Sequence, residues 1–358
     1  MGRARICLIT TGGTIGMVRV DGVLRPPDDP VALLEIAPEI HQIAEVTVVP
    51  LCNKDSVNMT PADWSALAST IHARLGPEHG YDGFVITHGT DTMQFTAAAL
   101  AFALGPELAV PVVLTGSQTD AGSLHGDART NLVRAVLVAT GVIAEVMICF
   151  GDLVFRGVRA QKRDRRRFAA FESPASSPLA EIATEVIVHP RARRRPSVRP
   201  SQIPPLQADF SPQVVQLPLL PGLRPDSVQG LLDPEHVSGV ILQTFGAGNV
   251  PDEGELSFIP FIRTAVATGL PVILTSQFPA SSTVASPYAT GAGAVRAGAI
   301  ATHNMTNSAA YVKLRWTVAQ VSAAIAGSEI GVGERLAEIS RRMGHCYVGE
   351  LDPDPDDA

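Results

Sequence analysis

The sequence predicts an α/β protein with two domains, each of which contains a parallel or mostly parallel β-sheet. Three observations support this fold class. Short runs rich in Val and Ile alternate with longer segments of helical pattern, the order expected of parallel strands joined by helices. Several of these runs are apolar at consecutive positions, as in strands that are covered on both faces. The chain has 358 residues, more than one compact core usually holds, so we expect two domains.

The N-terminal domain is placed at residues 1–187 and is the larger of the two. Its expected strands lie at 5–10, 46–50, 84–87, 110–115 and 146–150, and its expected helices at 61–75, 92–104 and 128–140. The first helix has the clearest beginning, because Thr60 can cap it and Pro61 fits its first turn. This order predicts a mostly parallel sheet that is flanked by helices.

A change in composition separates this domain from the second one. Residues 173–213 are rich in Pro and Ser and carry a basic run at 191–195, which is typical of a connecting segment. Within this segment we place the linker at 188–213. A smaller C-terminal α/β domain with a parallel sheet follows at 214–350, with expected strands at 214–217, 239–243 and 272–275 and expected helices at 255–268 and 307–327. The acidic residues 351–358 predict a disordered tail.

Composition excludes several classes of protein. Charged residues make up 18% of the chain and the formal net charge is −7, which argues against a general binder of nucleic acids or of membrane surfaces. We therefore interpret the basic clusters at 163–167 and 191–195 as solvated surface and not as an RNA site. No apolar run reaches the ~18 residues that span a membrane, and the N-terminus lacks the pattern of a signal peptide. We expect a soluble, cytoplasmic protein.

The sequence indicates neither a cofactor nor a metal site. Cys7, Cys52 and Cys149 lie in or beside apolar runs without CxxC spacing, so we expect buried free thiols. The nine histidines show no HExxH motif and no clustered ligand spacing. His88 lies in a turn beside glycine, where we expect it to order the turn and not to bind a metal.

Two of the expected strands end in motifs that combine glycine with hydroxyl side chains. The first ends in Thr-Thr-Gly-Gly-Thr, which closes with Thr14, and a later one ends in Thr-His-Gly-Thr-Asp, which contains Thr90 and Asp91. Glycine lets the backbone turn sharply and approach a ligand. A helix that begins at the second motif offers unpaired N–H groups to a carboxylate or an oxyanion. Because ligands bind beyond the carboxyl ends of parallel strands, both motifs indicate a binding site.

Together these motifs resemble the paired signature of the bacterial-type L-asparaginase family (asparaginase/glutaminase), and in detail the chain looks closest to the cytoplasmic type I branch. The resemblance continues through further segments, at residues 55–64, 114–118, 155–157 with Lys162, 245–249 and 288–291. It therefore covers nearly the whole chain. It implies an amidohydrolase that releases ammonia from the side-chain amide of L-asparagine.

The resemblance also implies catalytic roles. Thr14 would attack the amide carbon and form an acyl-enzyme that water then hydrolyses. The relay that activates the nucleophile or the water would consist of Thr90, Asp91 and Lys162, with Lys162 keeping the Asp91 carboxylate ionised. Backbone N–H groups near Gly13 and Thr90 are the expected oxyanion donors.

Substrate binding is carried over in the same way. The residues concerned are Ser56, Gly89, Thr90, Asp91, Ser117 and Asn249. Ser56 and the amides of the Gly89 turn suit an α-carboxylate, and Asp91 suits an α-ammonium group. The family supplies the residue that matches Asn249 from a neighbouring subunit, which implies a homodimer or homotetramer with active sites near subunit interfaces.

Three positions depart from the family pattern. The loop after the first strand normally carries a tyrosine beside the nucleophile, and the corresponding position here is Leu24, which has no hydrogen-bonding group. Asn58 stands where aspartate is more common. Phe278 lies where some type I enzymes have a cysteine that lines an allosteric site, so allosteric control is not carried over.

These departures leave three hypotheses open. The chain hydrolyses L-asparagine; or it performs the same chemistry on another amide, such as glutamine, a D-amino-acid amide or an asparagine-derived metabolite; or it is an inactive, amino-acid-binding relative. A distant resemblance to tRNA-dependent amidotransferase subunits does not change the expectation that nucleic acid is not a partner. Those proteins carry an extra N-terminal domain, whereas this chain reaches its first motif by residue 11.

Overall fold

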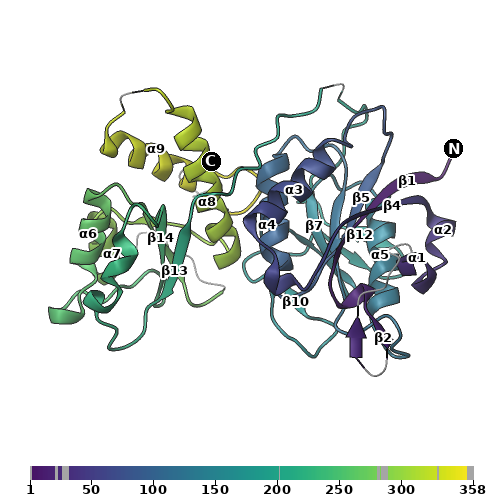
Figure 1. Cartoon of the computed structure of the whole chain (residues 1–358), viewed down its shortest axis with the longest axis horizontal. Helices are drawn as coiled ribbons and strands as arrows, with labels where there is room; N and C mark the ends of the chain where they lie inside the picture. Colours follow the sequence, from purple (N-terminus) through teal and green to yellow (C-terminus); the bar gives the residue numbers. More distant parts are fainter. Residues whose placement is uncertain are drawn as a thin grey trace. The chain divides into compact units, whose positions relative to one another are not determined.

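The computed structural model describes residues 2–20, 23–25, 32–200, 202–279, 283, 289–328 and 330–352. The chain forms two compact units that divide between Ala208 and Asp209. Each unit contains its own β-sheet with helices on both faces (Figure 1), which confirms the predicted α/β fold class. No helix within the described ranges is long and apolar enough to cross a membrane.

The N-terminal unit contains an eight-stranded sheet with the order β12–β11–β8–β7–β6–β5–β1–β4. Five of its strands run parallel: β4 (Ala44–Lys54), β1 (Ala4–Gly12), β5 (Gly83–Thr87), β6 (Val112–Thr115) and β7 (Val146–Phe150). Three antiparallel strands extend the β7 edge: β8 (Leu153–Arg156), β11 (Ala180–Ile182) and β12 (Val186–Val188). Every residue of β5, β6 and β7 is buried, as the predicted cover on both faces requires.

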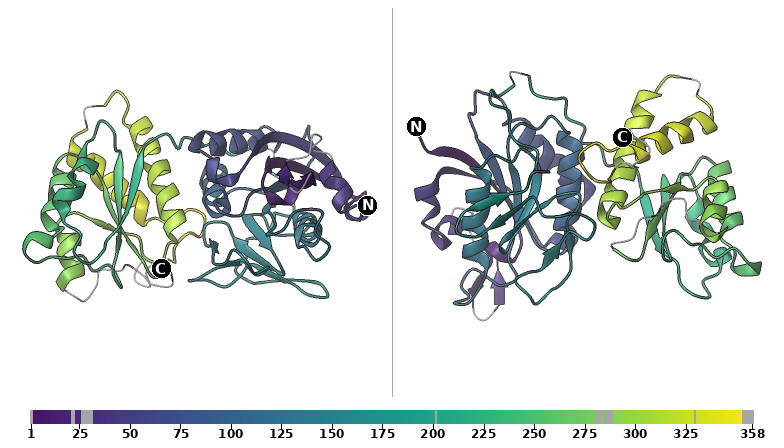
Figure 2. Two further views of the ribbon diagram at one scale, coloured as in Figure 1. Left: turned by 60° about the horizontal axis from the view of Figure 1, so that its bottom comes forward. Right: turned by 180° about the vertical axis from the view of Figure 1, so that it is seen from behind.

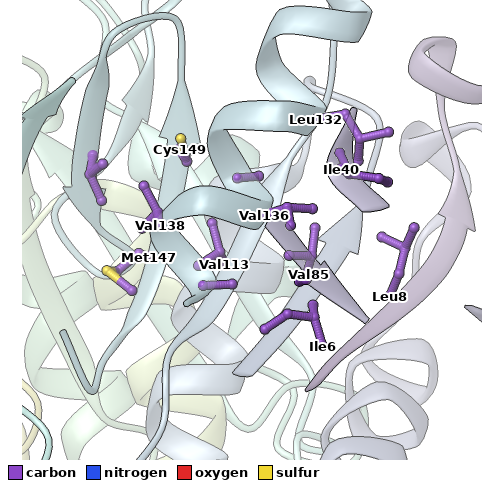
Figure 3. Close-up of a cluster of buried hydrophobic side chains, with 14 of the residues drawn as sticks. Ile6, Leu8, Ile40, Val85, Val113, Leu132, Val136, Val138, Met147 and Cys149 are labelled. Atoms are coloured by element: carbon purple, nitrogen blue, oxygen red, sulfur yellow. The ribbon is translucent and has the colours of Figure 1, made fainter. Parts of the chain in front are cut away.

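Helices cover both faces of this sheet (Figure 1). The helices on one face are α3 (Pro61–His72) and α4 (Met93–Leu104), and those on the other are α1 (Ala32–Ile36), α2 (Ile40–Ile43) and α5 (Ala128–Ala139). Helix α3 begins where the sequence predicts, because Thr60 and Asp63 form a capping box and Pro61 follows the cap. Figure 3 shows the core between α5 and the sheet, where Val136 packs with Val85 and other strand side chains.

The strand order creates a topological switch point between β1 and β5. From β1 the chain proceeds to β4 on one side, and after α3 it returns to β5 on the other side of β1. In open α/β sheets, ligands bind where neighbouring strands send the chain in opposite directions. Both glycine–hydroxyl motifs follow these two strands, so the topology brings them to the same edge of the sheet.

The C-terminal unit contains a parallel four-stranded sheet with β13 (Val214–Pro218), β14 (Gly239–Thr244), β15 (Val272–Ser276) and β16 (Ile300–Ala301) in chain order. One face packs against α6 (Ile259–Ala267) and α7 (Ala289–Arg296), and the other against α8 (Asn307–Ala324) and α9 (Val332–Gly344) (Figure 2). The helix predicted at 255–268 is divided, because residues 254–256 form a separate 3-10 turn before α6.

The linker at 188–213 stays a prediction. The Pro- and Ser-rich residues before it continue the sheet through β11 and β12, the second of which ends at Val188. The basic run at 191–195 is not simply solvated surface. The Arg193 guanidinium donates to the carbonyl of Ala144 at 2.6 Å, and Arg195 donates to that of Asp82 at 3.0 Å. Burial lowers the pKa of both arginines. These side chains fasten the connecting segment to the sheet.

The prediction of a disordered tail is wrong at its first two residues. Leu351 is buried, and Asp352 exchanges hydrogen bonds with Asn304 at 2.6 and 3.0 Å. Just before them, the buried Glu350 carboxylate lies 2.6 Å from the buried Lys313 ammonium. Residues 353–358 lie outside the described part of the chain.

All four cysteines are free thiols. Cys7 and Cys149 are buried, as the sequence predicts, and burial raises their pKa values to about 11 and about 12. Cys52 is half-buried, so the prediction of full burial is wrong there.

Candidate active site

The turn after β1 is a close approach of three backbone segments. Gly12 and Gly13 have φ values of 103° and 83°, in the region that favours glycine. A Cβ atom on Gly12 would lie 2.5 Å from the Lys54 carbonyl oxygen, and one on Gly13 would lie 2.4 Å from the Gly89 nitrogen. The β1 turn therefore lies against the β5 turn. Thr14 follows directly and begins the 3-10 turn η1 (Thr14–Gly16), where it is half-buried.

His88 holds the turn after β5. Its Nδ1 lies 2.7 Å from the Gly89 carbonyl oxygen and its Nε2 lies 2.9 Å from Thr96 Oγ1. Burial lowers the pKa of His88 to about 4, so the ring is neutral near pH 7 and has one donor and one acceptor. Nδ1 therefore carries the proton and donates to the Gly89 carbonyl, and the Thr96 hydroxyl donates to Nε2. His88 orders its turn, as the sequence predicts.

Lys162 joins the two polar residues that follow this turn. Its ammonium donates to Thr90 Oγ1 at 2.7 Å and to Asp91 Oδ1 at 2.6 Å. Thr90 is buried, and the side chains of Lys162 and Asp91 are 14% and 59% exposed. Because Thr90 accepts from the ammonium, its own hydroxyl hydrogen is free to point toward a ligand. The two-residue strand β9 (Gln161–Lys162), paired with β10 (Phe171–Glu172), presents the lysine.

Ser56 lies beside the β5 turn. A Cβ atom on Gly89 would lie 2.6 Å from Ser56 Oγ, so the absence of a side chain at Gly89 leaves room for this hydroxyl. Thr92 fixes the serine segment, because its Oγ1 donates to the Ser56 carbonyl at 2.7 Å. Sequence reasoning missed Thr92; its place just after Asp91 and before a helical pattern was the available signal.

Ser117 lies on the loop after β6, next to the same turn. A Cβ atom on the preceding Gly116 would lie 2.4 Å from the His88 carbonyl oxygen and 3.3 Å from Thr90 Cγ2. Ser117 is buried and its Oγ donates to the Thr119 carbonyl. Its hydrogen is thus engaged within the loop, and only the oxygen remains for a ligand.

The oxyanion donors expected near Gly13 and Thr90 stay a prediction. The Gly13 N–H itself donates to the Lys54 carbonyl oxygen at 3.2 Å, whereas the Thr14 N–H next to it donates to no described residue. The amides of Gly89, Thr90 and Asp91 likewise donate to none of the residues that the structure describes. The β5 turn and Thr14 therefore supply free N–H groups at this site.

Two further predicted positions have no contact with this cluster among the described interactions of their own unit. Asn249 lies in the C-terminal unit, in a turn where its N–H donates to the Phe245 carbonyl at 2.8 Å. Leu24 lies on the short strand β3 (Val23–Arg25), opposite Arg19 of β2 (Val18–Val20). Tyr288, within a segment that carries the resemblance, falls outside the described residues. No described residue hydrogen-bonds to the Thr14 hydroxyl.

The site contains no cluster of metal ligands. Within the described ranges, no group of three or more His, Cys, Asp or Glu side chains is arranged to hold a metal ion. The groups that meet here are hydroxyls, one ammonium, one carboxylate and free backbone amides. They can bind an amino-acid-sized molecule and transfer protons to and from it.

Comparison with protein families identifies the chain. Residues 5–194 match the family model for the asparaginase N-terminal domain, and residues 213–325 match the model for the glutaminase/asparaginase C-terminal domain. The chain belongs to the asparaginase family. This membership confirms the resemblance drawn from the motifs.

Comparisons with individual proteins agree with this assignment. The chain is 34% identical over 362 residues to L-asparaginase 1 of Escherichia coli, covering 99% of this chain and all of that protein. The crystal structure of L-asparaginase I from Vibrio cholerae matches 98% of this chain and all of its own, with a TM-score of 0.84 and 32% identity. The 60 kDa lysophospholipase of Mus musculus is 36% identical over 343 residues; the match covers 88% of this chain but only 59% of that protein.

Proposed function

We propose that the chain is an amidohydrolase that converts L-asparagine to L-aspartate and ammonia. One observation carries the proposal: the Lys162 ammonium donates to Thr90 Oγ1 and Asp91 Oδ1 beside the turn that carries Thr14. Two hydroxyls near a lysine and a carboxylate suit nucleophilic acyl transfer. The similarity to two proteins named L-asparaginase supports asparagine as the substrate.

In the first step, Thr14 acts as the nucleophile. Its Oγ bonds to the side-chain amide carbon, its proton passes to the amide nitrogen, and the C–N bond breaks to release ammonia. The product is an aspartyl ester on Thr14. The free amides of the β5 turn are suited to stabilise the oxyanion of the tetrahedral intermediate.

In the second step, water releases the acid. The water oxygen bonds to the ester carbon, one water proton returns to Thr14 Oγ, and the ester C–O bond breaks to give the β-carboxylate. Thr90 is suited to orient this water, because its oxygen is held by Lys162 and its hydrogen is free. Asp91 also accepts a hydrogen bond from the Lys162 ammonium.

Substrate recognition follows from the charges of an amino acid. Ser56 and the free amides of Gly89 and Thr90 suit the α-carboxylate, and the 59% exposed Asp91 suits the α-ammonium group. Ser117 can offer only its hydroxyl oxygen to the substrate, because its hydrogen is donated to the Thr119 carbonyl. Asn249 completes the site from a neighbouring subunit in this proposal, which makes the enzyme a homodimer or homotetramer that acts in the cytoplasm.

A second candidate function is the same reaction on a different amide. Leucine at position 24, where the family carries a hydroxyl beside the nucleophile, favours it. A lid without that hydroxyl alters both proton transfer and the shape of the pocket, so the preferred amide can differ from L-asparagine. Glutamine, D-amino-acid amides and asparagine-derived metabolites are the candidates.

The experiment that separates these functions is ammonia release from a set of amides by the purified protein. L-Asparagine is expected to give the highest kcat/KM among L-asparagine, L-glutamine and their D-forms. A higher value for another amide would replace the first proposal by the second. If none released ammonia while L-asparagine still raised the melting temperature, the chain would be a binding protein and not an enzyme.

A further inference from the structure

A cavity of about 250 Å³ lies beside the turn that carries Thr14. Gly12, Gly13 and Gly16 of that turn form one of its walls. The described residues around it include none of those assigned to the candidate active site: Thr14, Ser56, Thr90, Asp91 and Lys162. Among the described residues, the cavity thus shares the glycines that flank Thr14 with the candidate site and none of its polar side chains.

Two threonine hydroxyls that line the cavity have no hydrogen-bond partner among the described residues. Thr10 and Thr87 are 8% and 2% exposed, and they are register partners on the neighbouring strands β1 and β5. Within the described ranges, no group hydrogen-bonds to either hydroxyl. Their neighbours differ: Thr11 Oγ1 donates to the Thr87 carbonyl at 2.8 Å, and Thr115 Oγ1 donates to that of Cys149 at 2.9 Å.

Neither hydroxyl oxygen is among the fully buried unpartnered atoms of the described residues, so both are accessible from the cavity to water or to a ligand. Two such groups, side by side and both lining one cavity, form a small polar surface with two donors and two acceptors. Strand alternation places them on the same face as Leu8 and Val85, which point into the core in Figure 3. This polar pair is thus surrounded by apolar packing.

The remaining side chains around the cavity are mostly apolar. Leu33 of α1 contributes one wall, and Pro50, Leu51 and Cys52 of β4 contribute another, with Asn53 at its end. None of the described lining residues carries a formal charge. The volume suits about eight non-hydrogen atoms, since a water molecule in the liquid occupies roughly 30 Å³.

We propose that this cavity is a second ligand site, for a small uncharged molecule with an amide, carbonyl or hydroxyl group on a short aliphatic body. The polar group bonds to the hydroxyls of Thr10 and Thr87, and the aliphatic body packs along Leu33 and the β4 wall. A free amino acid is not the ligand, because its two charges would find no charged partner there. Gly12 and Gly13 lie between this ligand and Thr14, so binding of the ligand affects the position of the nucleophile.

Cys52 offers a reporter for the test. Its thiol lines the cavity, is half-buried and donates to the Thr11 carbonyl at 3.4 Å. Cys346 is a free, half-buried thiol in the other unit and serves as the internal control. The probe is n-butyramide, and n-butyrate is the charged control of the same length. The rate of alkylation of each cysteine by iodoacetamide is measured by peptide mass spectrometry at mildly alkaline pH, because burial raises the pKa of the Cys52 thiol.

Saturating n-butyramide is expected to slow alkylation of Cys52 at least about fivefold and to leave Cys346 unchanged, because an occupant of the cavity covers only the first thiol. n-Butyrate is expected to protect neither. A Thr14→Ala protein must give the same protection, so the result does not depend on the proposed reaction. Absence of protection, or equal protection by n-butyrate, would overturn the proposal.

Two threonine variants test the polar end of the site. Thr10→Val removes a hydroxyl that bonds to no described residue, so the variant is expected to keep its melting temperature and to lose the protection by n-butyramide. Thr115→Val removes a hydroxyl that has a partner and does not line the cavity, so it is expected to lower the melting temperature and to keep the protection. Equal protection in both variants would contradict the role of Thr10.

Thermal unfolding tests the same proposal without thiol chemistry. A ligand that binds only the folded protein raises its melting temperature. n-Butyramide is expected to raise that of the wild-type protein and not that of the Thr10→Val variant. No rise in the wild-type protein would overturn the proposal, whatever the reactivity of Cys52.

Discussion

Lys162 contacts two residues that stand more than 70 positions earlier in the chain. Its bond to Asp91 is an ion pair with a mostly exposed carboxylate, and such pairs contribute little on their own. Its bond to Thr90 differs, because that hydroxyl is buried beside the free amides of the β5 turn. In the proposed mechanism, the lysine fixes the direction of the Thr90 hydroxyl.

Replacing Lys162 by Met is expected to lower kcat at least about 100-fold, since a lost charge-assisted contact to a reacting group is worth about 3 kcal/mol. The melting temperature is expected to change little. Ammonia release under saturating L-asparagine measures the effect. Arg163→Met is the control, because this neighbouring cation is 68% exposed and pairs only with Glu172 in the described part. A Lys162→Met enzyme with half of the wild-type kcat would exclude the relay.

His88 makes stability depend on pH. Its pKa is about 4 in the folded protein, because burial disfavours the charged ring, and about 6.5 when unfolded. The unfolded state therefore binds more protons between these values, and stability falls as the pH is lowered from about 6.5 to about 4. Between pH about 7 and pH about 5 the free energy of unfolding is expected to drop by about 2 kcal/mol from this group alone.

Urea unfolding of the wild-type protein and of a His88→Asn variant at both pH values measures this contribution. The variant is expected to be less stable at neutral pH, because Thr96 loses its acceptor, but its stability should fall less on acidification. Equal pH dependence of the two proteins would show that His88 is not buried as a neutral ring.

At the scale of strands and helices, the sequence pattern predicted those elements whose position depends on local sequence. The strands β5, β6 and β7 were predictable because they are buried at every position and apolar except for the threonines that end β5 and β6. The strands β11 and β12 were not, because each has three residues, lies at or next to the sheet edge and is only partly buried. Their pairing partners are fixed by tertiary contacts that a linear pattern does not contain.

The contacts of the basic run at 191–195 were likewise not predictable from the sequence pattern. Arg193 reads as surface charge in sequence, yet its guanidinium and backbone bond to Ala144 and Glu145. The acceptors are mostly backbone carbonyls, and a carbonyl carries no sequence signal. The motif residues of the site were found by resemblance, whereas the free amides of the β5 turn and the engaged Gly13 N–H required the backbone geometry.

Glu145 is the acceptor that joins β8 to the basic run. Its 5% exposed side chain accepts from Arg156 at 2.6 and 3.0 Å and from the Arg193 N–H at 2.6 Å. Glu145→Ala is expected to lower the free energy of unfolding by about 3 kcal/mol, because it removes the carboxylate that pairs with the partly buried Arg156 guanidinium. Urea denaturation checks this value. Glu39→Ala is the matched control, because Glu39 forms an exposed pair with Arg129 and its removal should have almost no effect.

At the scale of the whole molecule, the proposed site needs a residue from the second unit. Asn249 belongs to the C-terminal unit, and the proposal takes it from a neighbouring subunit. Thr14→Ala and Asn249→Ala subunits are then expected to be inactive alone. After unfolding and refolding together, they should regain activity, because a hybrid dimer holds one complete site.

The expected recovery is about a quarter of the wild-type activity, since half of a random mixture of dimers is hybrid and each hybrid has one intact site of two. Ammonia release before and after mixing measures it. Without any recovery, the proposed sharing of sites between subunits would be excluded, provided that each variant refolds alone to its native melting temperature.

The central claim is that Thr14 forms an acyl-enzyme with L-asparagine, and rapid acid quench followed by peptide mass spectrometry tests it most directly. The protein is mixed with L-asparagine, quenched within one turnover and digested. An aspartyl ester is expected on the peptide that contains Thr14, and none is expected in the Thr14→Ala protein. An ester on the peptide that contains Thr90, or ammonia release by Thr14→Ala at the wild-type rate, would contradict the claim.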